Sequence, residues 1–226
     1  MKHTLFTLLA ALVASPAFAG SLNENDWETL CDGRGHAHNF TFVDGNLIAQ
    51  GDVTSGFPDT CDLLYKSAHK MENGSSLAIT LQFASTQGLE DFTVCTSHPD
   101  VDDAACLYVR TTGGGSFELK QWGAPITHLL TEASETPASL TLNFIVENGN
   151  LCYTYTFNGG ESEKFTVVEG FDTSLAWQPY FSWDVENATQ VTVTDVTFSM
   201  VPEPATATLS LLALAGLAAR RRRATR

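Results

Sequence analysis

The chain has 226 residues, with 26 acidic against 12 basic side chains and a formal net charge of −14. Half of the basic residues lie near the two ends, so residues 20–201 carry only six lysines and arginines against 25 aspartates and glutamates. Such a surface repels phosphate backbones and anionic membranes, which argues against nucleic-acid binding.

The N-terminal segment MKHTLFTLLAALVASPAFAG predicts a secretory signal peptide. Lys2 provides a positive start, Leu5 to Val13 form an apolar run, and Ala17-Phe18-Ala19 has the small-x-small pattern of a cleavage site. The apolar run is too short to make a good membrane-spanning helix. We therefore expect export through the Sec machinery and cleavage after Ala19, with 1–19 as the signal peptide.

Residues 20–201 are long enough for one domain with a substantial core, and their apolar residues alternate with polar ones. The clearest runs are SLAITLQFA at 76–84, SLTLNFIVE at 139–147 and LCYTYTF at 151–157. Alternation with a period of two predicts half-buried strands in antiparallel sheets. Asn148-Gly149 separates two of these runs and predicts a tight hairpin, because such turns need positive φ.

Further strands are expected between turn residues, at 37–43, 46–50, 61–66, 90–96, 105–111, 116–122, 161–168 and 189–199. In the last of them the apolar phase shifts, which predicts either a bulge near Asp195 or a strand buried on both faces. No amphipathic helix of normal length is evident in 20–201. The expected fold class is all-β, an antiparallel two-sheet sandwich or jelly roll.

The order of these segments resembles the concanavalin-like, laminin-G-like jelly rolls. The resemblance rests on DFTVCTSH at 91–98, CLYVRTTGGGSFELKQWG at 106–123, SLTLNFIVENGNLCYTYTFNGG at 139–160 and VTVTDVTFSM at 191–200. It covers most of 37–199 and implies a fold much more than an activity.

The domain contains all of the chain's cysteines, namely Cys31, Cys61, Cys95, Cys106 and Cys152. In an oxidising compartment they can form at most two internal bridges. Cys95 and Cys106 flank a loop of an expected hairpin, so we predict that they form a disulfide. Cys31 with Cys61 is the next choice, although pairings with Cys152 stay open.

Two short segments are candidate metal sites. Asp100, Asp102 and Asp103 lie close together in the loop between Cys95 and Cys106, and clustered oxygens suit calcium. A solvated acidic loop is the favoured alternative, because the spacing is not that of an EF-hand. His36 and His38 lack an evident third ligand, so a surface role is expected for them. Calcium is therefore the one candidate cofactor.

The segment AWQPYFSWD at 176–184 is a candidate glycan platform through Trp177, Tyr180 and Trp183. Aromatic faces stack on sugars, but aromatics in a sandwich more often pack in the core, and that interpretation is favoured. Trp122 has the same two interpretations.

A hydrolase would need two carboxylates close to the scissile bond. The laminarinase-type pattern Glu-x-Asp-x-x-Glu is approached only by Ser182-Trp183-Asp184-Val185-Glu186, which lacks the first Glu and the final spacing. No Gly-x-Ser-x-Gly nucleophile turn is present. We therefore expect a non-catalytic domain that binds a ligand, with a glycan as one candidate, or has a structural role. A carbohydrate-active hydrolase of concanavalin-like fold is the alternative.

Residues 202–226 form a tail with three physical parts. Pro202-Glu203-Pro204 predicts an extended linker, because neither proline fits a helix interior or a central strand. Ala205 to Ala219 is an apolar segment slightly short of the usual spanning length. Arg220, Arg221, Arg222 and Arg223 would mark its cytoplasmic end.

Together with the signal peptide, the tail resembles the PEP-CTERM sorting signals of exported proteins in Gram-negative bacteria. The motif Val201-Pro202-Glu203-Pro204, the short transmembrane segment and the arginine cluster carry the resemblance. It implies that exosortase, a membrane protease, recognises the tail and removes or transfers it. It further implies delivery to the cell surface or extracellular matrix, in association with extracellular polysaccharide.

Overall fold

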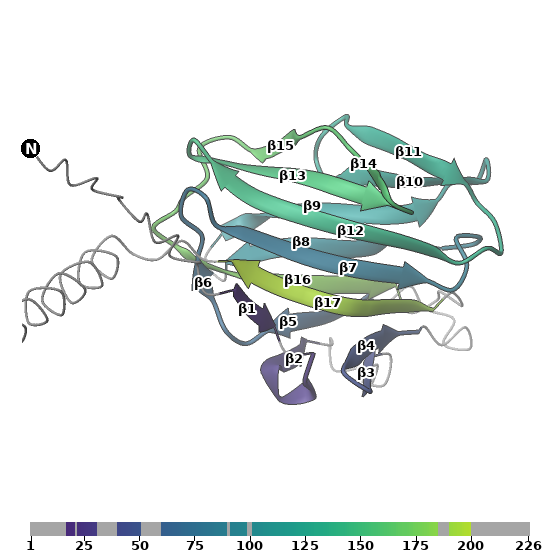
Figure 1. Cartoon of the computed structure of the whole chain (residues 1–226), viewed down its shortest axis with the longest axis horizontal. Coiled ribbons are helices and arrows are strands. Elements are labelled where there is room, and N and C mark those ends of the chain that lie inside the picture. Colours follow the sequence, from purple (N-terminus) through teal and green to yellow (C-terminus); the bar gives the residue numbers. More distant parts are fainter. Residues whose placement is uncertain are drawn as a thin grey trace, which may run out of the picture.

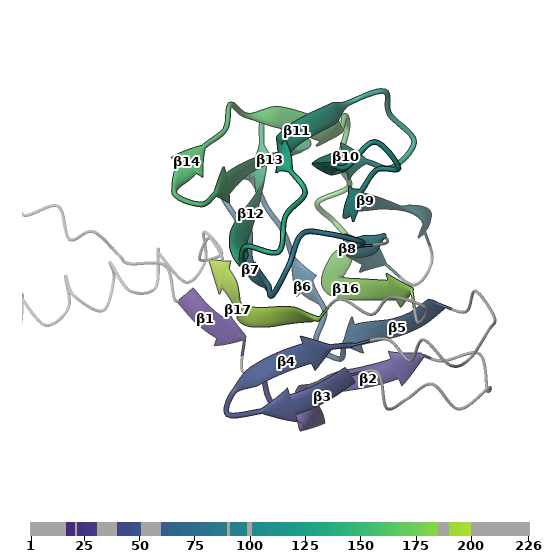
Figure 2. The same ribbon diagram turned by 90° about the vertical axis from the view of Figure 1, so that its right-hand side faces the viewer.

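A computed structural model of the chain describes residues 17–20, 22–30, 40–50, 60–89, 91–98, 101–184 and 190–199. The described chain forms two antiparallel β-sheets that face one another as two layers (Figures 1 and 2). This is the expected all-β sandwich. The single helical turn with described bounds is the 3₁₀ segment η1, Glu24–Asp26.

The first layer, called here the β12 sheet, has nine strands. Its main path runs β14 (Gly160–Glu161), β13 (Asn150–Phe157), β12 (Ala138–Glu147), β7 (Ser76–Phe83), β17 (Val191–Ser199), β4 (Asn46–Ala49), β3 (Phe40–Val43). Two more strands pair outside this path: β1 (Ala17–Gly20) with β17, and β15 (Phe165–Val168) with β13.

The second layer, called the β8 sheet, has eight strands. Its path runs β11 (Thr127–Glu132), β10 (Ser116–Gln121), β9 (Val101–Thr111), β8 (Phe92–His98), β16 (Ala176–Asp184), β5 (Thr60–Tyr65), β2 (Trp27–Leu30). The short β6 (His69–Lys70) pairs with β16.

Strict alternation of burial places the core between the two sheets. In β7 the side chains of Leu77, Ile79 and Leu81 have no exposed surface, and their neighbours Ala78 and Thr80 are only partly buried. Each fully buried leucine or phenylalanine contributes roughly 1.5–3 kcal/mol of apolar transfer free energy. The inner faces of both sheets are therefore committed to packing, and ligands must be sought on outer faces, edges or turns.

The turn residues behave as the sequence predicts. Asn148 and Gly149 have φ of 53° and 75°, and they join β12 to β13 with Glu147 opposite Asn150. Asn158 and Gly159 also have positive φ, of 47° and 87°. The register of β17 against β7 shifts between Val193 and Asp195. That bulge is the one predicted near Asp195, and it keeps the valines before and after it on the buried side.

Several strand predictions need correction. Residues 161–168 form two short strands, β14 and β15, in place of one. The strands β1, β2, β6, β11 and β16 were not predicted. β16 contains Pro179, which reads as a strand breaker because proline cannot donate to a ladder. It nevertheless pairs with Thr96 of β8 inside the sheet, where burial of its neighbours Phe181 and Trp183 holds the strand in place.

The chain enters and leaves the described domain on one strand pair. Ala17 of β1 lies opposite Ser199 of β17, and the two strands run side by side in Figure 1. Three of the four residues of β1 precede the expected cleavage point after Ala19. The tail expected from Pro202 lies outside the described residues, as do Val201 and the arginines Arg220–Arg223.

Candidate ligand-binding surface

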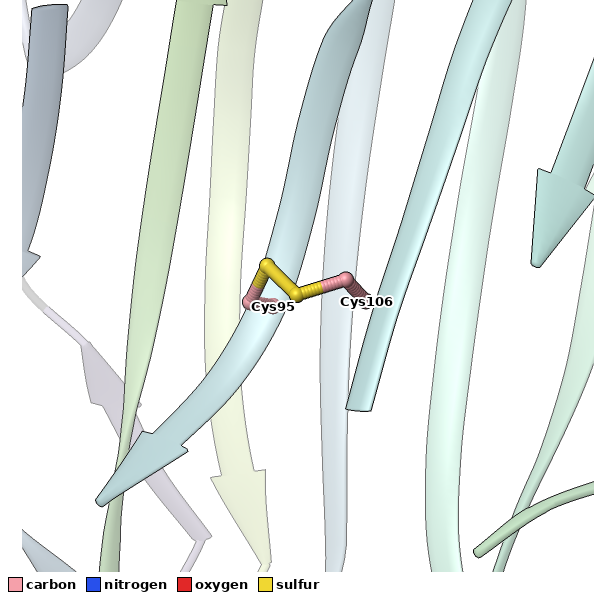
Figure 3. Close-up of a disulfide and its surroundings, with 2 residues drawn as sticks. All are labelled: Cys95 and Cys106. Atoms are coloured by element: carbon pink, nitrogen blue, oxygen red, sulfur yellow. A yellow bond between two sulfur atoms is a disulfide. The ribbon is translucent and has the colours of Figure 1, made fainter. Parts of the chain in front are cut away.

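A disulfide braces the middle of the β8 sheet. Cys95 of β8 and Cys106 of β9 lie directly opposite one another, and their sulfurs are 2.08 Å apart (Figure 3). This is the pair expected from the sequence. The amide of Trp122 donates a 3.0 Å hydrogen bond to the carbonyl of Cys106, so the bridge also supports the turn after β10.

Trp122 is the exposed member of the chain's four tryptophans. Its exposed fraction is 68%, whereas Trp27, Trp177 and Trp183 are at most 4% exposed. The turn that presents it continues through Gly123, whose φ is 72°, and its preceding residue Gln121 donates from Nε2 to the carbonyl of Val167 at 3.0 Å. The backbone is thus fixed while the indole projects outwards.

Around Trp122 the outer face of the β8 sheet gathers aromatic, apolar and charged side chains. We call the set Tyr108, Arg110, Glu118, Lys120, Trp122 and Leu129 the Trp122 patch. Leu129, with 67% of its surface exposed, lies opposite Glu118 on the neighbouring strand. Trp122 and Leu129 are two of the three large hydrophobic side chains that are exposed in the described chain, and exposed apolar groups that cluster mark interaction sites.

Tyr108 lies at the centre of the patch. Its ring is 5.9 Å from that of Trp122, in an edge-on arrangement. The guanidinium carbon of Arg110 and the Nζ of Lys120 lie 5.5 Å and 5.7 Å from the centre of the same ring. Each cation–π contact contributes roughly 0.5–1 kcal/mol at an exposed site. The tyrosine ring therefore orients both cations and the indole at once.

The two cations differ in their acidic partners. Nε of Arg110 donates to Glu118 Oε1 at 3.1 Å, and this hydrogen bond raises the pKa of the guanidinium above its usual value. Lys120 forms no ion pair with a described side chain. Its charge is consequently the one in the patch that is available to a ligand.

A polar row extends from the patch across the outer face of the sheet. Ladder pairing places Lys120 opposite Tyr108, Tyr108 opposite Thr93, Thr93 opposite Ser182, and Ser182 opposite Asp62. Directly opposed residues share a face, so these five side chains form a line over strands β10, β9, β8, β16 and β5. At about 4.8 Å per strand the line is ~19 Å long.

The far end of the row carries a carboxylate. Burial, with Asp62 as the nearest charge, raises the pKa of the Tyr180 hydroxyl to about 12. Asp62 Oδ1 is a buried atom with no hydrogen-bond partner. An unsatisfied buried acceptor favours a donor such as a water or a ligand hydroxyl.

The structure agrees with the favoured interpretation of the aromatic segment in β16, which was core packing, for its two tryptophans. Trp177 and Trp183 are 4% and 0% exposed, so both indoles belong to the core, and the platform hypothesis is wrong for these two residues. Trp183 packs edge-on against Phe92, with ring centres 5.1 Å apart. Tyr180 points to the other side of β16 and is half-buried on the outer face.

The expected metal sites are only partly within the described chain. Asp102 and Asp103 belong to β9, an extension of the strand beyond its expected start, whereas Asp100 lies outside the description. No group of three or more metal-binding side chains occurs among the residues described. His36, His38 and Cys31 also lie outside them, and Cys61 is described only as part of β5. Cys152 is a buried free cysteine.

A groove of about 800 Å³ lies at the other edge of the sandwich, where β2 and β3 end the two sheets. Trp27, Phe40, Phe42 and Lys66 contribute to its walls. The segments 31–39 and 51–59, which follow β2 and β4, lie outside the described residues. The patch is the more completely described of the two surfaces.

The sequence pattern around the glycine turn at 113–115 is consistent with the Trp122 patch, although the patch was not predicted from it. In CLYVRTTGGGSFELKQWG, Tyr108 and Arg110 share one parity before the glycine turn, and Glu118 and Lys120 share one after it. Folding this segment as a hairpin brings the four together. The remainder of the row comes from β16 and β5, whose adjacency is not local in sequence.

In the described part of the chain, no helix is long and apolar enough to cross a bilayer. The expected transmembrane segment, 205–219, falls outside that part. No known protein family matches the sequence, and no curated protein matches it either.

Several solved structures nevertheless have the same architecture as this chain. Lectin I from Ulex europaeus, in complex with the methyl glycoside of α-L-fucose, is 11% identical, with a TM-score of 0.55 over 83% of this chain and 98% of that one. The potassium-bound carbohydrate recognition domain of Emp46p is 10% identical, with a TM-score of 0.51 over 78% of this chain and 90% of that domain.

A native glycosidic hydrolase is similar as well, at 14% identity and a TM-score of 0.54 over 83% of this chain and 97% of that one. At such low identity these likenesses establish the fold alone. The chain therefore has the concanavalin-like jelly-roll fold shared by legume lectins, as its segment order predicts.

Proposed function

We propose that this chain is an exported surface or matrix protein whose sandwich binds a glycan through the Trp122 patch. The observation that carries the proposal is the 68% exposed indole of Trp122, two positions from Lys120, the first residue of a row of hydrogen-bonding side chains. Aromatic faces that stack on sugars, with polar groups beside them, are the usual components of carbohydrate recognition. One similar structure is a carbohydrate recognition domain, and another is a lectin in complex with a methyl glycoside. Both support a carbohydrate as the class of ligand.

The direct test is a glycan array with the full chain in mild detergent. Wild type, Trp122→Ala and Val43→Ala should be compared, because Val43 is also an exposed apolar residue, 47% exposed, but lies on β3 of the other sheet. We expect Trp122→Ala to lose about fivefold or more in affinity, as removal of an aromatic side chain that stacks on a nucleobase costs ~1–3 kcal/mol. Equal binding by all three proteins would contradict the assignment of the site.

Calcium belongs in the same experiment. We propose it only as an accessory ion at Asp100, Asp102 and Asp103, and the potassium-bound form of one similar lectin domain supports testing metals in this fold. The array should be run with millimolar calcium and with chelator. A calcium-dependent signal would assign a role to the ion, whereas identical signals would remove calcium from the proposal.

The domain is proposed to bind without hydrolysis. Asp62 of β5 and Glu118 of β10 lie four strand spacings or ~19 Å apart on the outer face, and the closer pair Glu118 and Asp91 acts on the Arg110 cation between them. Glycosidase carboxylates are roughly 5–9.5 Å apart. Asp184 of β16 is the other acidic position to test for the alternative, a hydrolase. Release of reducing sugar from a bound glycan, abolished by Asp62→Asn or Asp184→Asn, would favour hydrolysis.

Delivery is proposed to depend on the PEP-CTERM tail. The tail follows β17 in the chain, whereas cleavage after Ala19 would remove three of the four residues of β1, so the tail is the proposed attachment point. Replacing Pro202-Glu203-Pro204 by alanines should leave the precursor in the inner-membrane fraction, whereas wild type reaches the surface. N-terminal sequencing of the mature protein tests cleavage after Ala19. Surface delivery of the alanine variant would contradict exosortase recognition.

A further inference from the structure

We propose that the ligand of the Trp122 patch is an anionic glycan, and that the acidic group of one sugar residue binds Lys120. This inference rests on the proposed glycan-binding function and names the class of sugar. It starts from an unusual local charge: the chain carries a net −14, yet two of its few domain cations lie over one tyrosine ring. Glu118 balances Arg110, so Lys120 is the cation of this pair that has no ion-pair partner among the described side chains.

Arg110 and Lys120 have different tasks in this arrangement. Arg110 is neutralised by Glu118, with an Nε to Oε1 distance of 3.1 Å, and Asp91 also acts on its charge. The partner of Lys120 is the face of Tyr108 at 5.7 Å. A ring face leaves the ammonium donors unpaired, so Lys120 can donate hydrogen bonds to a carboxylate or sulfate without losing an ion pair.

The geometry joins this cation to the stacking surface. Lys120 lies near the end of β10, and Trp122 follows two positions later as the first residue of the turn. Both contact Tyr108, which fixes the cation beside the indole. A sugar stacked on Trp122 therefore places its substituents next to Lys120, where a uronate carboxylate or a sulfate ester replaces water.

The charge along the row also limits the ligand. The row begins with Lys120 and ends with Asp62, ~19 Å away across four strand spacings. An acidic group is attracted at the Lys120 end and repelled at the Asp62 end. The arrangement therefore selects a glycan with an isolated acidic residue over one with an acidic group on every residue.

The test uses matched pairs of oligosaccharides on an array, followed by calorimetry with the full chain in detergent. Within each pair, glucuronic acid replaces glucose at one position, or one hydroxyl carries a sulfate; cellobiouronic acid and cellobiose form one such pair. We expect at least about fivefold tighter binding of the acidic member, equivalent to the ~1 kcal/mol or more of a charge-assisted hydrogen bond. Raising the salt concentration should erase the preference.

Three variants locate the charge. Lys120→Met should abolish the preference for acidic members and leave the affinity for neutral members within about twofold of wild type. Lys120→Arg keeps the positive charge and should therefore retain the preference for acidic members. Lys164→Met is the matched control: it removes the same charge, but Lys164 is paired with Glu147 at 2.6 Å on the β12 sheet side. Thermal unfolding of each variant checks that the fold is intact.

The outcomes separate the two proposals. Binding that depends on Trp122 but favours neutral members, or that Lys120→Met and Lys164→Met affect equally, overturns the acidic-glycan inference and leaves the glycan-binding function standing. A preference within the uronate pairs but not the sulfate pairs, or the reverse, identifies the acidic group. Absence of binding to every member overturns the proposed function and this inference with it.

Discussion

The Trp122 patch and the β16 segment both display tryptophans from the same sheet, and the two regions have opposite fates. Trp183 is completely buried and packs on Phe92, whereas Trp122 is 68% exposed and, among described rings, contacts only Tyr108, in an edge-on arrangement. The difference is positional. Trp183 stands on the inward parity of a central strand, and Trp122 stands in a turn. The same residue type is core in one place and surface in the other, so composition cannot identify a sugar platform.

The largest expected difference between the two regions is in stability. Trp183→Ala should lower the free energy of unfolding by about 3–5 kcal/mol, because it removes a fully buried ring and leaves a cavity. Trp122→Ala should change it by less than about 0.5 kcal/mol. Urea unfolding of both variants measures this. Similar losses in the two proteins would mean that Trp122 is structural and would weaken its assignment to a ligand.

The disulfide beneath the patch gives the next effect. Cys95→Ala with Cys106→Ala should cost about 3 kcal/mol, since the bridge closes a loop with a sequence separation of 11 in the unfolded chain. The Trp122 amide donates to the backbone carbonyl of Cys106, so a less firmly held β9 backbone should position Trp122 less well and lower the ligand affinity too. Cys152→Ala is the control, as it removes a buried thiol on the other sheet and should lose only about 1 kcal/mol, with unchanged affinity. Full affinity in the double variant would separate the bridge from the patch.

A smaller effect tests the layer under the patch. On β11, Leu129 faces outwards, while the ring Nε2 of His128 lies 2.7 Å from the Tyr153 hydroxyl of the opposite sheet. Burial lowers the pKa of His128 below its usual value of about 6.5. The unfolded chain then binds the proton more readily, so stability is retained above about pH 6.5 and decreases as pH falls from there towards the lowered folded value.

His128→Gln removes this titration and keeps a hydrogen-bonding group. The decrease in stability between pH 7.5 and pH 5 should therefore be smaller in the variant than in wild type, measured by urea unfolding. His69, whose pKa burial also lowers, is unchanged in both proteins and cancels in the comparison. Identical pH profiles would show that the His128–Tyr153 contact does not couple to protonation.

The smallest expected effect concerns Tyr180, the outward residue of the otherwise buried β16 segment. Since burial, with Asp62 as the next cause, raises its pKa to about 12, its hydroxyl should stay protonated at pH 10.5. The ultraviolet absorbance of Tyr180→Phe should follow that of wild type up to pH 10.5. Above that pH, the variant should show a smaller absorbance increase, because it lacks the ionisation of Tyr180. Loss of a normal titration near pH 10 would place Tyr180 in water and remove it from the buried end of the row.

The sequence by itself determined the local features. Alternation specified strands such as 76–83, the Asn148-Gly149 pair specified its hairpin, and the spacing of Cys95 and Cys106 specified the bridge. Each depends on neighbours within one strand or one turn, where backbone dihedrals and side-chain parity act directly. The shift in the apolar alternation near Asp195 likewise indicated the bulge that the structure has there.

Only the tertiary structure decided the rest. β16 forms a central strand despite Pro179, because burial of Phe181 and Trp183 outweighs the missing ladder donor. The row from Lys120 to Asp62 exists because β8, β16 and β5 are neighbours in space, a pairing that no local pattern encodes. Exposure of Trp122 and burial of Trp183 follow from the same long-range packing, since parity assigns a residue to a face but only the opposing sheet determines which face is covered.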